Sequence, residues 1–175
     1  LQWLRTRGIR IAAHVGAIGN IDDLPFDAVT VGEKEFALLG ERSDFPVLDA
    51  QRGAAMRTLI EQVRAEGDSV GGIIECAATG LPAGLGEHMF DRLSAILFGI
   101  PAVKGVEFGD GFASSRKKGS ENNDPFITDG TRITTATNHC GGILGGMTDG
   151  MPLIFRVAMK PTPSIFKEQD SVDMR

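Results

Sequence analysis

Apolar residues alternate with polar or small ones close to the start of the chain. A period of two is typical of a strand with one buried face. We therefore predict a strand over residues 9–15, with Ile9, Ile11, Ala13 and Val15 on its apolar face. His14 falls between them and is expected on the polar face, at a surface or interface rather than in a catalytic role.

Helical spacing of apolar residues is found further along the chain. Asp49 is a predicted N-cap for a helix that reaches about residue 66. A second amphipathic helix is predicted over about residues 87–98, and Pro101 stops it. The segment 29–44 is ambiguous, with a short helix expected at 33–39. Residues 1–8 have the pattern of the last turns of a helix that ends at Gly8.

Further strands are predicted over residues 70–79, 102–108, 132–137 and 153–160. Helices do not follow every strand, and the last strands have hairpin-like spacing. This order predicts an α+β fold in one core domain, a β-α-β layered sandwich of mainly antiparallel sheets with two principal helices. A parallel doubly wound sheet is disfavoured.

Residues 109–130 form a long polar stretch without a regular pattern, which is typical of a functional loop. We expect it to be mobile and to cover a site. The helix remnant at the start and the polar segment at the end, from Gln169, lead us to expect that the chain is a truncated piece of a longer one.

Composition narrows the classes of function. The chain has 23 glycines in 175 residues, concentrated between Gly67 and Gly150, which indicates either many sheet turns or a cradle for a flat or anionic ligand. The net charge of −5 disfavours nucleic acid as a partner. No apolar run of the roughly 20 residues needed for a membrane span and no signal-peptide pattern is present. The two cysteines, Cys76 and Cys140, favour a reducing cytoplasm over a disulfide framework.

Common catalytic and nucleotide motifs are missing from the sequence. There is no phosphate-binding G-x-x-x-x-G-K-[ST], and the glycines of 141–146 have the wrong spacing for a dinucleotide fingerprint. Ser69 follows a predicted helix and precedes a strand, the reverse of a nucleophile elbow. His139 beside Cys140 lacks partners for a metal site, so we expect no metal.

The most informative motif comes directly after the last predicted strand. It consists of a lysine, two hydroxyl residues and two prolines that stiffen the turn: Lys160, Pro161, Thr162, Pro163 and Ser164. Such a turn could hold a phosphate or the edge of a flavin, or it could be a rigid exit from the strand.

A co-linear series of segments resembles the chorismate synthase family. The matching residues are 67–72, 82–91, 100–112, 119–124, 138–146 and 160–164. The resemblance covers about residues 9–172. It implies a lyase of the shikimate pathway, which makes the precursor of aromatic amino acids: a cytoplasmic homotetramer that converts 5-enolpyruvylshikimate 3-phosphate to chorismate and phosphate by anti-1,4-elimination with reduced FMN.

The resemblance also implies which residues contact the cofactor. The family's FMN contacts fall on Pro101, Ala102, Gly145, Lys160, Pro161, Thr162, Pro163 and Ser164. Some members have Asn where this chain has Pro101, so the resemblance does not carry over a side-chain contact there, and Cys140 replaces a small Ala or Ser. The basic run Arg116, Lys117 and Lys118 is expected to attract the trianionic substrate.

The family's N-terminal substrate-binding histidine and arginines, its second histidine and its Arg-His-Asp-Pro segment have no counterparts in these 175 residues. No catalytic residue is therefore assigned, and we expect this chain alone to be inactive and prone to self-association. The alternatives are a non-catalytic flavin-binding, anion-binding or assembly module with the same fold, and a structural piece without a ligand.

Overall fold

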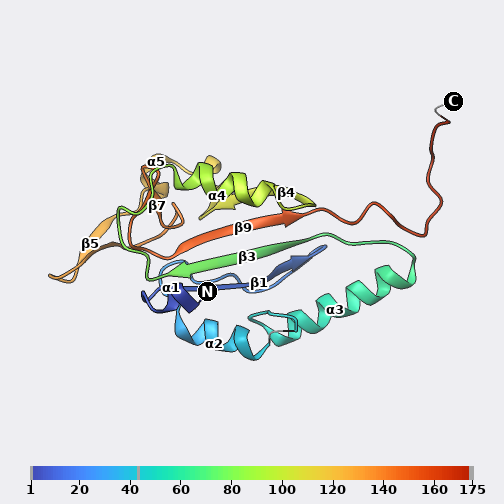
Figure 1. Ribbon diagram of the computed structural model, residues 1–175, viewed down its shortest axis with the longest axis horizontal. Coiled ribbons are helices and arrows are strands. Elements are labelled where there is room, and N and C mark those ends of the chain that lie inside the picture. Colours follow the sequence, from blue (N-terminus) through green and yellow to red (C-terminus); the bar gives the residue numbers. More distant parts are fainter. Residues whose placement is uncertain (1, 43, 174–175) are drawn as a thin grey trace.

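The computed structural model describes residues 2–42 and 44–173, and its centre is a five-stranded antiparallel sheet (Figure 1). Its strands are β1 (Arg10–Ile18), β2 (Ile21–Asp22), β3 (Gly72–Thr79), β4 (Val103–Phe108) and β9 (Leu153–Met159). They are arranged in the order β2-β1-β3-β9-β4. The longer strands match the predicted ones. The expected α+β architecture with mainly antiparallel pairing is confirmed.

The helices are α1 (Gln2–Arg5), α2 (Glu33–Glu41), α3 (Ala50–Ala65), α4 (Met89–Phe98) and α5 (Gly119–Asn122). The predicted cap of α3 is confirmed, because the Asp49 carboxylate accepts the backbone N–H groups of Gln51 and Arg52 at 2.8 and 3.0 Å. The two principal helices are α3 and α4, as expected. They lie on opposite sides of the sheet in Figure 1.

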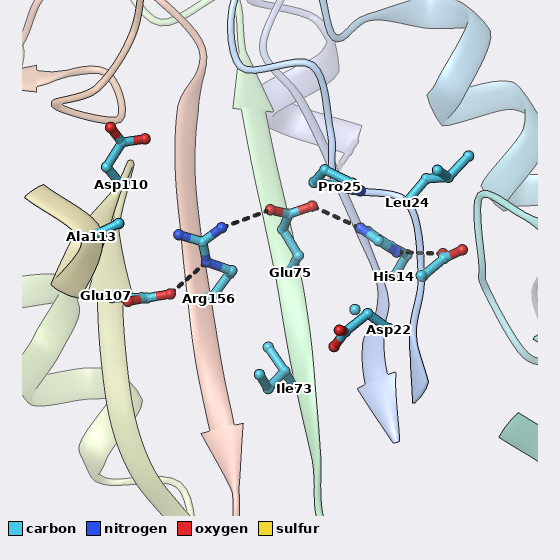
Figure 2. A pocket seen from close by; sticks show the side chains of 12 residues that line it. His14, Asp22, Leu24, Pro25, Ile73, Glu75, Glu107, Asp110, Ala113 and Arg156 are labelled. Atoms are coloured by element: carbon cyan, nitrogen blue, oxygen red, sulfur yellow. Dashed lines mark hydrogen bonds and ion pairs between the residues drawn. The ribbon is translucent and has the colours of Figure 1, made fainter. Parts of the chain in front are cut away.

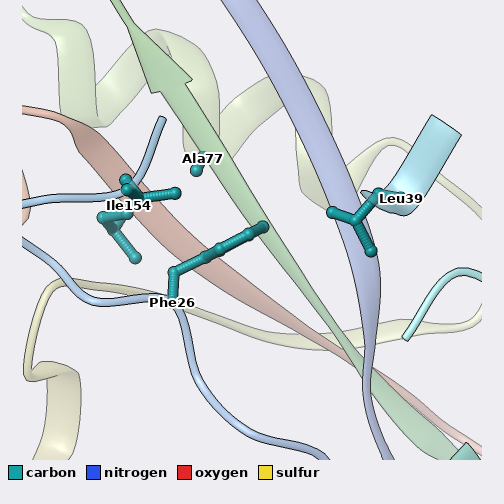
Figure 3. Packing of buried hydrophobic residues seen from close by; sticks show 5 residues of the cluster. Phe26, Leu39, Ala77 and Ile154 are labelled. Carbon is teal, nitrogen blue, oxygen red and sulfur yellow. The ribbon is translucent and has the colours of Figure 1, made fainter. Parts of the chain in front are cut away.

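Both faces of the sheet are covered, and neighbouring residues of β3 show this directly. Ala77 belongs to a buried cluster with Phe26, Leu39 and Ile154 (Figure 3). Ala78 belongs to a different cluster, which contains residues of α4 and the first residue of β9, Leu153. Because side chains alternate across a strand, these clusters lie on opposite faces. Met56 of α3 is fully buried and packs beside β1.

The face predicted to be buried in β1 is wrong over its first half. Ile11 is 41% exposed, whereas His14 is only 1% exposed. Ala12 packs against the cluster that contains Phe26, on the same face as His14. The pairing register then shifts between Val15 and Ala17. This β-bulge brings Ala17 onto the face of His14, although the two residues are three positions apart and would lie on opposite faces of a regular strand. The expectation of a surface or interface position for His14 is therefore incorrect.

The segment after β4 is more ordered than its pattern suggested. It contains a 3-10 helix, η1 (Gly111–Arg116), then α5, and then β5 (Phe126–Thr128), which pairs with β6 (Ile133–Thr135). The expectation of a structureless stretch over 109–130 is wrong, and its mobility stays a prediction. A second small hairpin joins β7 (Ile143–Leu144) to β8 (Met147–Thr148). Within the described residues, no helix has the length and apolar character needed to cross a membrane.

Candidate functional site

A row of charged side chains crosses the central sheet on the face opposite α4. His14 of β1 is the direct cross-strand partner of Glu75 on β3. Glu75 pairs in turn with Arg156 on β9, and Arg156 pairs with Glu107 on β4. Asp23, just after β2, completes the row on the far side of His14. Figure 2 shows the side chains of His14, Glu75, Arg156 and Glu107 linked one to the next from strand to strand.

His14 lies buried between two carboxylates. Its Nδ1 is 2.9 Å from Asp23 Oδ2, and its Nε2 is 2.9 Å from Glu75 Oε2. The same Asp23 oxygen accepts Leu48 N–H at 2.6 Å, and the same Glu75 oxygen accepts Phe26 N–H at 2.8 Å. Both ring nitrogens therefore face carboxylate oxygens. Buried carboxylates need such partners to remain charged away from water.

Arg156 connects this buried part of the row to the surface. Its Nε donates to Glu107 Oε1 at 2.7 Å, and its Nη1 lies 3.7 Å from Glu75 Oε1. Its Nη2 donates to the carbonyl of Gly109 at 2.6 Å. The guanidinium thus satisfies acceptors on three sides, which a lysine could not do with the same planar geometry.

A cavity of about 400 Å³ opens along this row. Besides His14 and Arg156, its lining includes the carboxylates of Asp22, Asp23, Glu75, Glu107 and Asp110. Carboxylates outnumber cations in this lining. A phosphate-bearing ligand would be repelled here, so the cavity is a poor site for an anion.

The sequence analysis missed this row, although a signal was present. Glu75 and Arg156 are each a charged residue inside an otherwise apolar strand. Such a residue is either at a functional site or paired with an opposite charge. The partner follows only from the strand register, which the sequence does not reveal.

Near the cavity mouth, Asp110 binds two basic side chains. Its carboxylate contacts Lys117 Nζ and lies 2.7 Å from His139 Nδ1, while Lys117 Nζ is 3.0 Å from the same ring nitrogen. Burial opposes ionisation of Asp110, but Lys117 and His139 outweigh it and hold the pKa of that carboxyl below its usual value.

Asp124 fastens the other end of the same loop. Its carboxylate accepts Thr137 Oγ1–H at 2.7 Å and the backbone N–H groups of His139 and Cys140 at 2.7 and 2.9 Å. Burial opposes ionisation here too, but these hydrogen bonds lower the pKa of Asp124. Residues 137–140 therefore bind the loop near both of its ends, at Asp110 and at Asp124.

The thiols are poorly suited to nucleophilic chemistry. Burial, with a smaller effect of Glu75, raises the pKa of Cys76 to about 11. Burial and the neighbouring Asp124 raise the pKa of Cys140 to about 11 as well. A thiolate is the reactive form, and little of it exists near neutral pH at such values. Across residues 2–42 and 44–173, no group of three or more His, Cys, Asp and Glu side chains could hold a metal ion.

The structure brings most of the sequence-predicted cofactor residues together at one end of the sheet. Lys160 follows β9, and its backbone N–H donates to the carbonyl of Ala102 at 2.9 Å. Ala102 has a φ of 73°, a left-handed conformation uncommon outside glycine. Pro101 beside it is exposed, and so are Pro161, Thr162, Pro163 and Ser164.

The turn after Lys160 is pinned in place while its polar groups stay accessible. Ser69 Oγ donates to the carbonyl of Thr162 at 2.6 Å. Gly71 lies so close to it that a Cβ there would be 2.5 Å from Met159 O and 3.0 Å from Pro161 Cδ. Lys160 Nζ has a weak contact with its neighbouring carbonyl, Pro161 O, at 3.2 Å. Its charge is therefore free to meet a ligand.

Gly145 is the predicted contact that lies apart from the others. It forms the β7–β8 turn with Gly146, with φ values of 59° and 85°. Gly146 O accepts Met89 N–H at 3.0 Å, at the start of α4, whereas Pro101 comes just after its end. A helix of 10 residues is about 15 Å long. A ligand that touched both groups would have to extend along α4.

Comparison with known proteins shows the family of the chain. The family model described as chorismate synthase matches residues 1–175. The chain belongs to the chorismate synthase family. A chorismate synthase from Lancefieldella parvula is 45% identical over 189 residues, which cover 100% of this chain and 50% of that protein. The enzyme of the same name from Opitutus terrae is 54% identical over 129 residues, covering 71% of this chain and 36% of the relative.

A crystal structure of a chorismate synthase superposes with a TM-score of 0.81 at 31% identity. The match covers 93% of this chain and 52% of the solved one. The chain thus spans about half the length of the curated chorismate synthases that it matches.

Proposed function

We propose that this chain forms part of a chorismate synthase, a lyase that converts 5-enolpyruvylshikimate 3-phosphate to chorismate and phosphate by anti-1,4-elimination. The observation that carries the proposal is the family match over the whole chain. The pairing of Lys160 with Ala102 supports it, because residues 58 positions apart in the sequence meet where the family's flavin contacts fall.

We propose reduced FMN as the cofactor, and the chemistry of the available groups fits it. A flavin phosphate is an anion, and Lys160 offers a cation beside the hydroxyls of Thr162 and Ser164 on a stiffened turn. Pro101 and Ala102 offer an exposed apolar edge, and nothing lies within 4 Å of a Cβ built at Gly145. When bound, the reduced flavin supplies electron density to the substrate during the elimination.

The chain's own residues would hold and shield these ligands. The turn 160–164 orients the flavin through Lys160, while Arg116 and Lys118, both exposed on the loop after β4, meet the anionic substrate. The acidic cavity beside Glu75 repels phosphate and so directs anions away from the charged row.

We propose that this chain alone does not release phosphate, because the acid–base groups implied by the family lie outside its 175 residues. We further propose a homo-oligomer, a tetramer in the complete enzyme, located in the cytoplasm. The β5–β6 hairpin supports assembly, since Phe126 and Ile133 are 66% and 73% exposed. Nucleic acid and membranes are not among the proposed partners.

The decisive experiment is a titration of the chain with FMN, followed by quenching of flavin fluorescence. Lys160→Ala is expected to weaken saturable binding about tenfold, the loss of one charge-assisted contact of about 1.4 kcal/mol. Lys34→Ala, an exposed lysine of α2, is the matched control and should leave the dissociation constant unchanged. No binding by the unaltered chain would refute the proposed flavin contacts at residues 101–102 and 160–164.

The second candidate is a non-catalytic module that binds a flavin or another anion, or that only assembles. The exposed polar turn 161–164, in a chain to which no catalytic residue is assigned, favours it. Phosphate release from substrate, measured with reduced FMN after the remaining half of a family member has been added, separates the two candidates. A part of the enzyme should then release phosphate, whereas a non-catalytic module should release no phosphate.

A further inference from the structure

The turn that follows β4 is attached to the sheet by a backbone hydrogen bond from Gly109 N–H to Ile154 O at 3.0 Å and by the side chains of Glu107 and Arg156. Its Nη2 donates to Gly109 O at 2.6 Å, where the turn begins. Its Nε donates to one oxygen of Glu107 at 2.7 Å, and the other oxygen of Glu107 accepts Phe112 N–H at 3.1 Å. Arg156 therefore holds the turn directly at Gly109 and, through Glu107, at Phe112.

The backbone of the turn is tightly packed at Gly109 and Gly111. A Cβ at Gly111 would lie 2.1 Å from Glu107 Oε2, and one at Gly109 would lie 2.1 Å from His139 O. These close approaches are possible because glycine permits the left-handed φ of 55° at Gly109 and of 52° at Gly111. A small displacement of Glu107 would therefore move the turn.

The orientation of Arg156 is set by the rest of the charged row. Glu75 lies 3.7 Å from Nη1, on the side away from Glu107. Glu75 is itself held by His14 and by the backbone N–H of Phe26. The guanidinium is thus fixed from the interior, while its outward edge binds the turn.

The turn leads into the basic residues of the loop. Lys117 is bound to Asp110 and His139, whereas Arg116 and Lys118 are exposed. Where these cations lie depends on residues 109–112, since η1 begins at Gly111.

We propose that Arg156 is a positioning residue: it fixes the loop over residues 109–118 against the sheet, so that Arg116 and Lys118 face an anionic ligand. The attachment of the loop follows from contacts within this chain. The identity of the ligand, the phosphate of the flavin or of the substrate, rests on the proposed function.

A protease that cleaves after lysine tests the attachment without any ligand, because Lys117 and Lys118 lie in the loop and Lys34 lies in α2. In Arg156→Ala and in Glu107→Gln, cleavage after Lys117 and Lys118 should be about tenfold faster than in the unaltered chain, since native-state proteolysis follows local opening. Cleavage after Lys34 should stay unchanged. Arg92→Gln, on α4, is the control for loss of an arginine.

Chemical rescue distinguishes positioning from general packing. Guanidinium chloride at about 10 mM, roughly a hundredfold below denaturing concentrations, should restore slow loop cleavage in Arg156→Ala. The same concentration of sodium chloride should not. Glu107→Gln keeps the testing possible if Arg156→Ala does not fold. In this variant one of the two side-chain oxygens becomes an NH₂ group. The remaining oxygen can occupy the position that faces Arg156 or the position that faces Phe112 N–H, but not both.

Loop cleavage within twofold of the unaltered chain in both variants would overturn the proposal. Equal acceleration of cleavage after Lys34 would overturn it too. So would loop cleavage in Arg156→Ala that stays fast in the presence of guanidinium. FMN titration of the same variants is read separately. If the unaltered chain binds no FMN while the loop still opens in the variants, the proposed flavin contacts fail and the role of Arg156 in holding the loop stands.

Discussion

His14 and Glu75 are direct cross-strand partners on β1 and β3, with 2.9 Å between Nε2 and Oε2 inside the fold. Their side chains are at most 4% exposed. A histidine and a glutamate at such depth are stable only as a bonded pair, and Asp23 on one side and Arg156 on the other extend the pair into a row. The row joins the β2 edge of the sheet to the loop after β4.

Replacing the histidine should destabilise the fold strongly. In His14→Asn the amide has one N–H₂ donor group for two carboxylates, so one acid is left without its partner. We expect the free energy of unfolding to fall by about 3–5 kcal/mol, as for other broken buried ion pairs. Urea denaturation followed by circular dichroism measures it.

The control for this change is His88→Asn. His88 is exposed and has a φ of 61°, which asparagine tolerates, so the effect should stay within about 0.5 kcal/mol. A loss below about 1 kcal/mol in His14→Asn would show that the buried row is not a stabilising unit.

Gly109 and Gly84 differ in surroundings but share a positive φ, of 55° and 79°. A Cβ at Gly109 would be 2.1 Å from His139 O, whereas nothing lies within 4 Å at Gly84. Gly84→Ala should therefore cost only the backbone strain of about 1–2 kcal/mol. Gly109→Ala should cost at least about 2 kcal/mol more, because backbone atoms must also move. Equal losses in urea denaturation would contradict the close packing of this turn.

Acid should loosen the attachment of the loop. The lowered pKa values of Asp110 and Asp124 mean that both carboxylates bind fewer protons in the folded state. Their contribution to stability is therefore present above their unfolded pKa of about 3.9 and is lost as pH falls through the lower folded values. The midpoint of urea denaturation should drop as the pH falls below about 4.

The substitution Asp124→Asn should flatten that pH dependence, since the group that loses its charge is gone. Asp170→Asn removes an exposed carboxylate from the C-terminal segment and serves as the control. An unchanged acid dependence in Asp124→Asn would assign the effect to other carboxylates.

The cysteines should react slowly. With thiol pKa values raised to about 11, about one part in a thousand of Cys76 and Cys140 is ionised at pH 8. Alkylation by iodoacetamide at pH 8 should therefore be about a hundredfold slower than that of a free thiol with its usual pKa, and should accelerate as the pH rises.

The variants Cys76→Ser and Cys140→Ser assign the rate to each residue. Unfolding in urea should restore the ordinary rate in both. Reaction of the folded chain at the rate of a free thiol would contradict the burial of these groups.

Local patterns predicted the elements well. Asp49 marks the start of α3 because its carboxylate caps the backbone directly beside it, and such short-range preferences need no tertiary structure. The order of strands and helices predicted the α+β class, and the series of family segments predicted the fold. The resemblance also predicted contacts at Ala102 and Lys160. Their proximity agrees with one site, although their contact with flavin stays a prediction.

The charged row could not be derived in the same way. His14 was assigned to the wrong face, because Ile11 and Ala13 lie on one side of β1 and only the packing of Phe26 and α2 decides which side is buried. Glu75 and Arg156 were visible as charges in apolar strands, but their partners depend on register.

The sequence by itself thus determined the longer helices and strands, the α+β class and the family, since periodicity, caps and motifs are local properties. The tertiary structure alone decided which face of β1 is buried, the pairing of Asp23, His14, Glu75, Arg156 and Glu107, and the position of the Gly145 turn at the start of α4. The physical reason is that burial and pairing arise between segments far apart in the chain, where strand register and a single β-bulge determine which side chains meet.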